Sequence, residues 1–339
     1  MAHPARWWRP LGDNRIVCEL CPQGCIIPDG ATGNCGARFA EYGQLCTNAW
    51  GAGTYPVADP IEKKPLYHFL PGSSVLSFGL FGCNLSCSFC QNWRLSSNHD
   101  YDSLQSLTPE KCVKMALEHG CSSLAFTYNE PAISSEFCIE VSKAARQAGL
   151  RTVAVSNGYI HNEARSELFD VIDAANIDIK SINADFYSAH CGGRLEPVLE
   201  TLVYLTRSKR IWVELTNLLI PSLNDSDSDI DSLARWIGAN LGYNVPLHFS
   251  AFHPEYRMQN LPRTPYSTLC LARERALVHG LKYVYIGNTP QPQITFCPDC
   301  QRELIRREGY NVSKHGVLTN KCPDCAAEIA GVFDYSSSK

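Results

Sequence analysis

Short apolar runs alternate with longer amphipathic segments along the chain from about residue 75 onward. The apolar runs predict buried strands, and the segments with apolar residues every three or four positions predict helices. Strands are expected at residues 75–80, 123–127, 152–155, 175–179, 212–217, 246–250 and 283–286, and helices at 109–119, 134–148, 197–206, 226–239 and 268–279. This alternation predicts a parallel sheet of right-handed βαβ units. We therefore expect an α/β fold, a partial or nearly closed (β/α) barrel, with small cysteine-rich modules at both ends.

The distribution of cysteine and proline divides the chain into four parts. Residues 1–55 form a cysteine-rich module, and residues 292–335 form a second one. Residues 56–74 are rich in proline, which disfavours helix in each preceding residue, so this part is expected to be an extended strap. The predicted barrel occupies residues 75–291.

Composition narrows the class of protein. The 339 residues are 45% hydrophobic and 19% charged, as in a folded globular protein, and carry no apolar run of membrane-spanning length. The first residues lack the apolar core of a secretion signal, so a cytoplasmic location is expected. In that compartment the 17 cysteines indicate metal or cluster ligation rather than disulfides. The net charge of -4 gives no broad basic surface, and no nucleic-acid partner is expected.

Three cysteines follow the first predicted barrel strand, with the spacing Cys-x3-Cys-x2-Cys: Cys83, Cys87 and Cys90. Three thiolates on one short loop suit a four-iron cluster and leave one iron without a protein ligand. An open coordination position is what a catalytic metal site needs. The alternatives are a zinc knuckle or three buried thiols without a metal.

A second set lies near the N-terminus, at Cys18, Cys21, Cys25 and Cys35. Four soft ligands in so short a segment predict a metal site, since such a module could scarcely fold without a metal crosslink. Zinc and an auxiliary iron–sulfur cluster are both compatible with thiolate ligands.

The third set consists of two Cys-Pro-Asp-Cys knuckles, with Cys297, Cys300, Cys322 and Cys325. Two knuckles at this separation predict a zinc-ribbon or rubredoxin-like module around one tetrahedral metal. A structural zinc ion is favoured over redox iron.

Polar residues gather where the predicted strands end, which is where the functional residues of parallel α/β barrels lie. They include Asn129, Glu130, Asn157, Asp178, Lys180 and His253. By contrast, His248 lies inside a predicted strand and is expected to be a core histidine.

The cysteine triplet, with Phe89 directly before its last member, resembles the radical S-adenosylmethionine (SAM) superfamily. That resemblance implies a [4Fe-4S] cluster that cleaves SAM reductively, and a 5′-deoxyadenosyl radical that removes hydrogen from a substrate. It also implies that Asn129 and Glu130 stand where the superfamily holds the methionine amine. Ser-Asn157-Gly and Asp178-x-Lys180 resemble motifs of glycyl-radical-enzyme activases, in which the lysine meets the SAM carboxylate. The activases place an aromatic-His pair near SAM, which His253 matches.

Nearly the whole chain resembles the AmmeMemoRadiSam system radical SAM enzyme, which is similar to pyruvate formate-lyase activating enzymes. The resemblance lies in the N-terminal cysteines, the segment from Asp59, the cysteine loop, Thr-Tyr-Asn-Glu-Pro from Thr127 and the terminal ribbon. The resemblance implies a reduced flavodoxin- or ferredoxin-like electron donor. It also implies AMMECR-type and Memo-type proteins as partners.

Three functions follow from these patterns. The first is a radical SAM enzyme that abstracts hydrogen from an unidentified substrate. The second is an activase acting on a backbone glycine of a glycyl radical enzyme. The third is a non-catalytic, metal-stabilised module that binds protein or nucleic acid through its basic ribbon.

Overall fold

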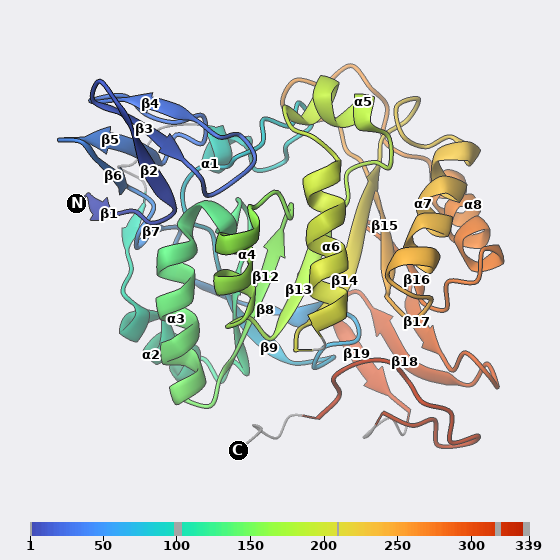
Figure 1. Ribbon diagram of the computed structural model, residues 1–339. Helices are drawn as coiled ribbons and strands as arrows, with labels where there is room; N and C mark the ends of the chain where they lie inside the picture. Colours follow the sequence, from blue (N-terminus) through green and yellow to red (C-terminus); the bar gives the residue numbers. More distant parts are fainter. Residues whose placement is uncertain (1, 98–103, 209, 316–319, 335–339) are drawn as a thin grey trace.

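An eight-stranded sheet forms the centre of the computed structural model, which describes residues 2–97, 104–208, 210–315 and 320–334 (Figure 1). Its strand order is β16-β15-β14-β13-β12-β11-β9-β8. The strands are β8 (Val57–Pro60), β9 (Ser74–Phe78), β11 (Ser123–Phe126), β12 (Arg151–Ser156), β13 (Ala174–Asp178), β14 (Trp212–Leu219), β15 (Leu247–Ala251) and β16 (Val284–Gly287). Seven strands are parallel, and β8 adds antiparallel to β9. Because β16 and β8 are opposite edges, the sheet is open, and the expected α/β partial barrel is confirmed.

Helices follow the strands in the expected alternation. They are α2 (Pro109–Glu118), α3 (Ser135–Gln147), α4 (Asn162–Phe169), α6 (Glu196–Ser208), α7 (Asp227–Asn240) and α8 (Tyr266–Val278). Short turns of helix add α1 (Trp93–Ser97), η2 (Pro131–Ser134), α5 (Ala184–Phe186) and η3 (Tyr187–Cys191). The start of α2 shows why local sequence predicts it: the Thr108 side chain accepts a hydrogen bond from the Lys111 amide, and Pro109 occupies the first turn.

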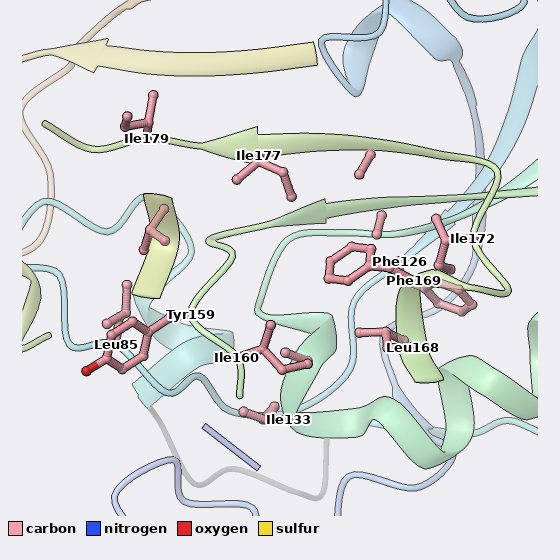
Figure 2. Close-up of a cluster of buried hydrophobic side chains, with 14 of the residues drawn as sticks. Leu85, Phe126, Ile133, Tyr159, Ile160, Leu168, Phe169, Ile172, Ile177 and Ile179 are labelled. Carbon is pink, nitrogen blue, oxygen red and sulfur yellow. The ribbon is translucent and has the colours of Figure 1, made fainter. Parts of the chain in front are cut away.

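The core lies between the sheet and these helices. Figure 2 shows Phe126 of the sheet beside Leu168 and Phe169 of α4, and Ile177 of β13 belongs to the same buried cluster. Each is almost fully buried, and burial of such a side chain contributes about 1.5–3 kcal/mol. The sequence did not predict α4, because its eight residues carry few apolar positions; its packing against the sheet stabilises it.

Small antiparallel sheets lie at both ends of the chain, on opposite sides of the view in Figure 1. The N-terminal strands are β1 (His3–Pro4), β2 (Trp8–Gly12), β3 (Arg15–Cys18), β4 (Ile26–Pro28), β5 (Arg38–Glu41) and β6 (Gln44–Thr47), and β7 (Ala52–Gly53) pairs with β10 (Gln105–Ser106). The C-terminal strands are β17 (Gln293–Phe296), β18 (Glu303–Glu308) and β19 (Asn311–Lys314). Residues 1 and 335, the outer limits of the two expected modules, lie outside the described residues.

The predicted strap is extended only in its first part, where Val57–Pro60 joins the sheet as β8. The 3-10 turn η1 (Ile61–Lys63) follows, and the chain then runs along the C-terminal ribbon. The Leu70 amide donates to the Val332 carbonyl at 2.8 Å, and the Val332 amide donates to the His68 carbonyl at 2.7 Å. The strap therefore connects the ribbon to the sheet.

A buried carboxylate, Glu214 at the start of β14, fixes the strap to the sheet. It accepts hydrogen bonds from the amides of Tyr67 and His68 at 3.0 and 2.7 Å, and contacts His248 Nε2 at 2.8 Å. Burial alone would raise the pKa of Glu214, but the hydrogen bond from His248 and its charge bring that pKa below its usual value. His248 is thus the expected core histidine.

We expect the protein to lose stability as the pH falls from about 7 to 4. His68 is fully buried, with Nδ1 at 2.6 Å from the Ala330 carbonyl and Nε2 at 2.6 Å from the Tyr285 hydroxyl, and burial lowers its pKa to about 4. The unfolded chain, with a histidine pKa of about 6.5, binds the proton first, so this histidine alone removes about 3 kcal/mol over that range. Denaturant titration at several pH values measures the loss. A His68→Gln variant should show a flatter pH dependence, and an unchanged slope would contradict this origin.

No helix among the described residues is both long enough and apolar enough to cross a membrane.

Candidate active site

One pocket at the carboxyl ends of the strands gathers nine of the ten residues predicted to bind the SAM-cleaving cluster or SAM. Its volume is about 400 Å³, within the range of about 300–1,000 Å³ that small-molecule sites occupy. The predicted residues that line it are Cys83, Cys87, Phe89, Cys90, Asn129, Glu130, Asn157, Asp178 and Lys180. His253 is not part of this lining, and its contact with SAM stays a prediction.

Backbone hydrogen bonds join the loop that carries the three cysteines to the segment around η3. The Ser86 amide donates to the Cys191 carbonyl at 2.8 Å, and the Ser88 amide donates to the His190 carbonyl at 2.9 Å. Gly82 precedes the first cysteine with a φ of 81°, and a Cβ at this position would lie 2.4 Å from the Cys35 carbonyl oxygen. Glycine is therefore required there, for its backbone conformation and for the close approach.

The three sulfur atoms are placed to hold a cluster. They line the pocket from one loop, and the Asn157 side-chain amide and the Leu85 backbone amide lie 3.7 and 3.5 Å from Cys83 Sγ. Burial raises the pKa of the Cys83 thiol well above its usual value. A coordinating metal deprotonates such a thiol outright. Three thiolates with hydrogen-bond donors beside them, open on one side to a polar pocket, fit a [4Fe-4S] cluster with one iron free for a ligand.

Cys191 is a fourth sulfur near this loop, which the sequence did not single out. The neighbouring Cys191 thiol lowers the pKa of Cys87, and the charge of Lys180 acts in the same direction. Cys191 is fully buried in η3 and does not line the pocket. Its place beside Cys87 follows from the docking of η3 under the loop, so no local pattern could have revealed it.

Glu130 follows β11, with its carboxylate bound by the end of β12. It accepts from the Ser156 hydroxyl at 2.7 Å, the Asn157 amide at 2.7 Å and the Ala132 amide at 2.9 Å. Burial raises its pKa to about 7, against the opposing effect of these hydrogen bonds. A carboxylate offers about four acceptor positions, so these three donors leave one unfilled.

Asn129 fixes the backbone around the cysteine loop. Its side-chain oxygen accepts from the Leu80 amide at 2.8 Å, and its side-chain nitrogen donates to the Gly82 carbonyl at 2.9 Å. Phe89 packs against Phe186 at a ring distance of 5.8 Å. Both residues therefore position the loop in this structure, and direct contacts with SAM stay predictions.

Asp178 and Lys180 come together where β13 ends. Lys180 Nζ lies 2.7 Å from Asp178 Oδ2, and both line the pocket. Asp178 and the nearby thiols raise the pKa of Lys180 above its usual value, although burial alone would lower it. Lys180 thus stays protonated and offers an ammonium group to an anionic ligand at the pocket wall.

The strap contributes residues that the sequence did not assign to the site. Lys64 lines the pocket, lies 3.0 Å from Asp59, and stands over the Tyr128 ring at 4.8 Å. The Tyr128 hydroxyl donates to Asp59 at 3.1 Å, and Tyr128 itself has a φ of 71°, which is strained for a non-glycine residue. The proline spacing indicated only an extended strap. The contact of Lys64 with the pocket depends on how the folded strap packs against the sheet, which the spacing does not show.

The four C-terminal cysteines form a compact ligand set. Their sulfur atoms all lie within 4.8 Å of one another, with 3.5 Å between Cys297 and Cys325 and 3.6 Å between Cys300 and Cys322. A tetrahedral ion with zinc–sulfur bonds of about 2.3 Å separates its ligands by roughly 3.8 Å. The set therefore fits one metal ion, as the zinc-ribbon prediction requires.

The four N-terminal cysteines surround a second pocket, next to the first. Cys18, Cys21, Cys25 and Cys35 line it together with the buried Arg38. Arg38 is paired with Glu136 at 2.6 Å. This arrangement places the four thiols around a small cavity of about 10 Å³, with the Arg38 guanidinium beside them.

Comparison with known proteins adds family information. The model of the radical SAM superfamily matches residues 79–237. An uncharacterized protein of Methanocaldococcus jannaschii is 42% identical over 96% of this chain and 98% of its own length. The pyruvate formate-lyase-activating enzyme of Clostridium pasteurianum is 23% identical over 46% of this chain and 66% of its own length.

Among solved structures, a radical SAM methyltransferase from Sphaerobacter thermophilus superposes with a TM-score of 0.53 at 14% identity. The match covers 84% of this chain and 76% of that one. At this identity the likeness concerns the fold alone.

Proposed function

The chain belongs to the radical SAM superfamily, and we propose that it cleaves SAM reductively and uses the resulting radical on a substrate bound in the pocket at the strand ends. One observation carries the proposal. The three thiols, Glu130 and the Asp178–Lys180 pair come from three separate places in the sequence and all line one pocket. A cluster and SAM bound there supply one-electron cleavage of a carbon–sulfur bond, yielding methionine and a 5′-deoxyadenosyl radical that takes a hydrogen atom from substrate.

The residues of the chain bind and orient in this scheme. Cys83, Cys87 and Cys90 hold the cluster. Glu130 offers its remaining acceptor position to the amine of SAM, and Lys180 faces the carboxylate. Asn129 holds the loop through the Gly82 carbonyl and would thereby position the cysteines that bind the cluster.

We expect Lys180→Met to raise the KM for SAM by about 10- to 100-fold, because a hydrogen bond to a charged group contributes about 1.5–3 kcal/mol. The rate at saturating SAM should change much less, since the lysine binds the ligand rather than the reacting bond. Initial rates over a range of SAM concentrations separate the two effects. Lys143→Met, on the exposed face of α3, is the matched control. An unchanged KM in the Lys180 variant would remove it from the SAM site.

The proposed function is tested by anaerobic incubation of the iron-loaded protein with SAM and dithionite. We expect 5′-deoxyadenosine and methionine to accumulate in equal amounts. Protein that carries a full cluster but produces neither would contradict the proposal and favour the non-catalytic binding module.

A second candidate is an activase that acts on a backbone glycine. It is supported by relatives named as activating enzymes, including a putative glycyl-radical enzyme activating enzyme of Methanocaldococcus jannaschii, 24% identical over 47% of this chain and 66% of its own length. A glycine-centred radical signal on a co-purified protein after SAM cleavage would decide for it. SAM cleavage coupled to a modified small molecule would decide against it.

We further propose that the protein works in the cytoplasm with a reduced flavodoxin- or ferredoxin-like donor. AMMECR-type and Memo-type proteins are proposed partners on the resemblance of motifs alone. Co-purification with each partner, compared with a Cys83→Ala variant that retains the same surface, tests this association.

A further inference from the structure

We propose that Cys18, Cys21, Cys25 and Cys35 hold a second iron–sulfur cluster, which relays single electrons from a donor protein to the cluster at Cys83, Cys87 and Cys90. The destination of the electron rests on the proposed function; the second cluster itself does not. Four observations support the proposal: the spacing of the sulfur atoms, the number of ligands, the contact between the two cysteine segments, and the graded exposure of the ligands.

The spacing of the sulfur atoms distinguishes the two terminal cysteine sets. Among the residues that the structure describes, the C-terminal set has its four ligand atoms within 4.8 Å of one another, and the N-terminal set does not. The N-terminal sulfurs instead line a pocket. A single ion with bonds of about 2.3 Å needs the compact arrangement, whereas in a four-iron cluster each thiolate binds a different iron and stands farther from the others. The N-terminal set lacks the compact spacing of a single-ion site, which favours the cluster.

The number of ligands indicates what such a cluster does. Four thiolates fill one coordination position on each of four irons, so no iron stays open for SAM or substrate. The loop at Cys83 has only three cysteines lining its pocket and keeps that opening. A fully ligated cluster acts by gaining and losing electrons, and its role beside an open cluster is electron transfer.

The two cysteine segments are in direct contact. The Cys35 carbonyl oxygen packs so close to Gly82 that a Cβ there would lie at 2.4 Å, and Gly82 is bonded to Cys83. The Gln23 side-chain amide donates to the Asn84 carbonyl at 2.8 Å. In Figure 1 the strands of the N-terminal module lie beside α1, which follows the cysteine loop. Short bonded and packed paths therefore join the two sites.

Asn84 links the two pockets through its hydrogen bond with Asn157. It lines the N-terminal pocket, and its side-chain oxygen accepts from the Asn157 amide at 2.9 Å. The same Asn157 nitrogen lies 3.7 Å from Cys83 Sγ. One amide thus connects the wall of the N-terminal pocket to a ligand of the SAM-cleaving cluster.

The N-terminal ligands differ in exposure. Cys18 and Cys21 are buried, whereas Cys25 and Cys35 are partly exposed. Arg38, which is 1% exposed, lines the pocket and offsets part of the negative charge that four thiolates bring. Cys25 and Cys35 give a donor protein access to the cluster, and Cys35 also carries the carbonyl that packs against Gly82.

The electron balance is simple. A reduced flavodoxin- or ferredoxin-type protein loses one electron, and the N-terminal cluster gains it. That cluster is reoxidised when the electron passes to the cluster at Cys83, Cys87 and Cys90, where cleavage of SAM consumes it. One donor molecule is oxidised by one electron for each SAM cleaved, and the N-terminal cluster returns to its starting state.

The first test uses a full-length variant with Cys83, Cys87 and Cys90 replaced by alanine, which removes the SAM-cleaving cluster. After anaerobic reconstitution we expect about four irons and four sulfides per chain, with about one zinc in the ribbon. Reduced flavodoxin should generate an electron paramagnetic resonance signal in this variant. A variant with about two zincs and no iron, or a cluster that reduced flavodoxin leaves oxidised, would overturn the proposal.

The second test adds Cys25→Ser and Cys35→Ser to the otherwise intact chain, with Cys46→Ser as the matched control in the same module. We expect 5′-deoxyadenosine formation driven by reduced flavodoxin to fall at least about tenfold, and formation driven by dithionite to stay within about twofold of wild type. Equal rates with both reductants would overturn the relay. If the double variant does not fold, as circular dichroism will show, the first test decides alone. Wild type that makes no 5′-deoxyadenosine with dithionite refutes the proposed function, and the metal count still decides on the second cluster.

Discussion

A variant with Cys83, Cys87 and Cys90 replaced by alanine should form no 5′-deoxyadenosine from SAM and dithionite, a loss of at least about a thousandfold. The cluster supplies the electron and the coordination position, and no side chain can replace either. The three thiols line one pocket from one loop, so their loss leaves the remaining pocket residues in place. Anaerobic incubation followed by chromatography measures the product, and iron analysis measures the lost cluster.

The control for this variant is Cys270→Ala. Cys270 lies on α8, is partly exposed, and belongs to none of the three cysteine sets. It should retain wild-type iron content and activity. Persistent 5′-deoxyadenosine formation in the triple variant would show that SAM cleavage occurs elsewhere on the chain.

The second large effect concerns the ribbon. Replacing Cys297 and Cys325 by serine should remove about one zinc per chain and unfold the segment around β17, β18 and β19, because structural zinc contributes about 10–16 kcal/mol to the folding of small zinc modules. The knuckles present four sulfur atoms within 4.8 Å and little core besides, so the metal is their main crosslink. Zinc analysis and limited proteolysis measure the change.

Loss of the ribbon should also weaken the rest of the molecule. Arg307 of β18 donates to the Tyr67 carbonyl at 2.6 Å, and Val332 pairs with the strap on both sides of Phe69. Losing about 2 kcal/mol of such contacts lowers the Tm by about 3 °C in a chain of this length, because the unfolding entropy is about 2.1 cal/mol/K per residue. Cys270→Ser serves as the control. Full zinc content in the double variant would place the metal elsewhere.

The sequence by itself determined the features that depend on neighbouring residues. Cys83, Cys87 and Cys90 lie within one loop, so their spacing alone defines a three-thiolate site. The C-terminal knuckles likewise carry their ligands in pairs. The alternation of strand and helix indicated a parallel sheet, because burial on both faces leaves continuous apolar runs that are visible in the chain. In this fold class, functional residues lie at the carboxyl ends of the strands. That rule identified Glu130, Asn157 and Lys180 as candidate site residues.

Only the tertiary structure decided what these residues contact. The oxygens of Glu130 are bound by Ser156 and Asn157, the Asn129 amide holds the cysteine loop, and Cys191 reaches Cys87 through the docking of η3. Each of these contacts joins residues that are 26 to 104 positions apart, or depends on where a distant turn packs. Such contacts produce no recognisable sequence pattern in either of the two segments that they join.

Other elements were also decided by packing across the molecule. Helix α4 is stabilised by the sheet beneath it, β8 by pairing with β9, and the strap by its contacts with Glu214 and the ribbon. The N-terminal cysteines are the sharpest case. Their spacing allowed zinc or a cluster, and the choice between them depends on how far apart the folded chain holds the sulfur atoms. Distances between side chains are set by the burial and hydrogen bonding of whole segments, which a local pattern does not contain.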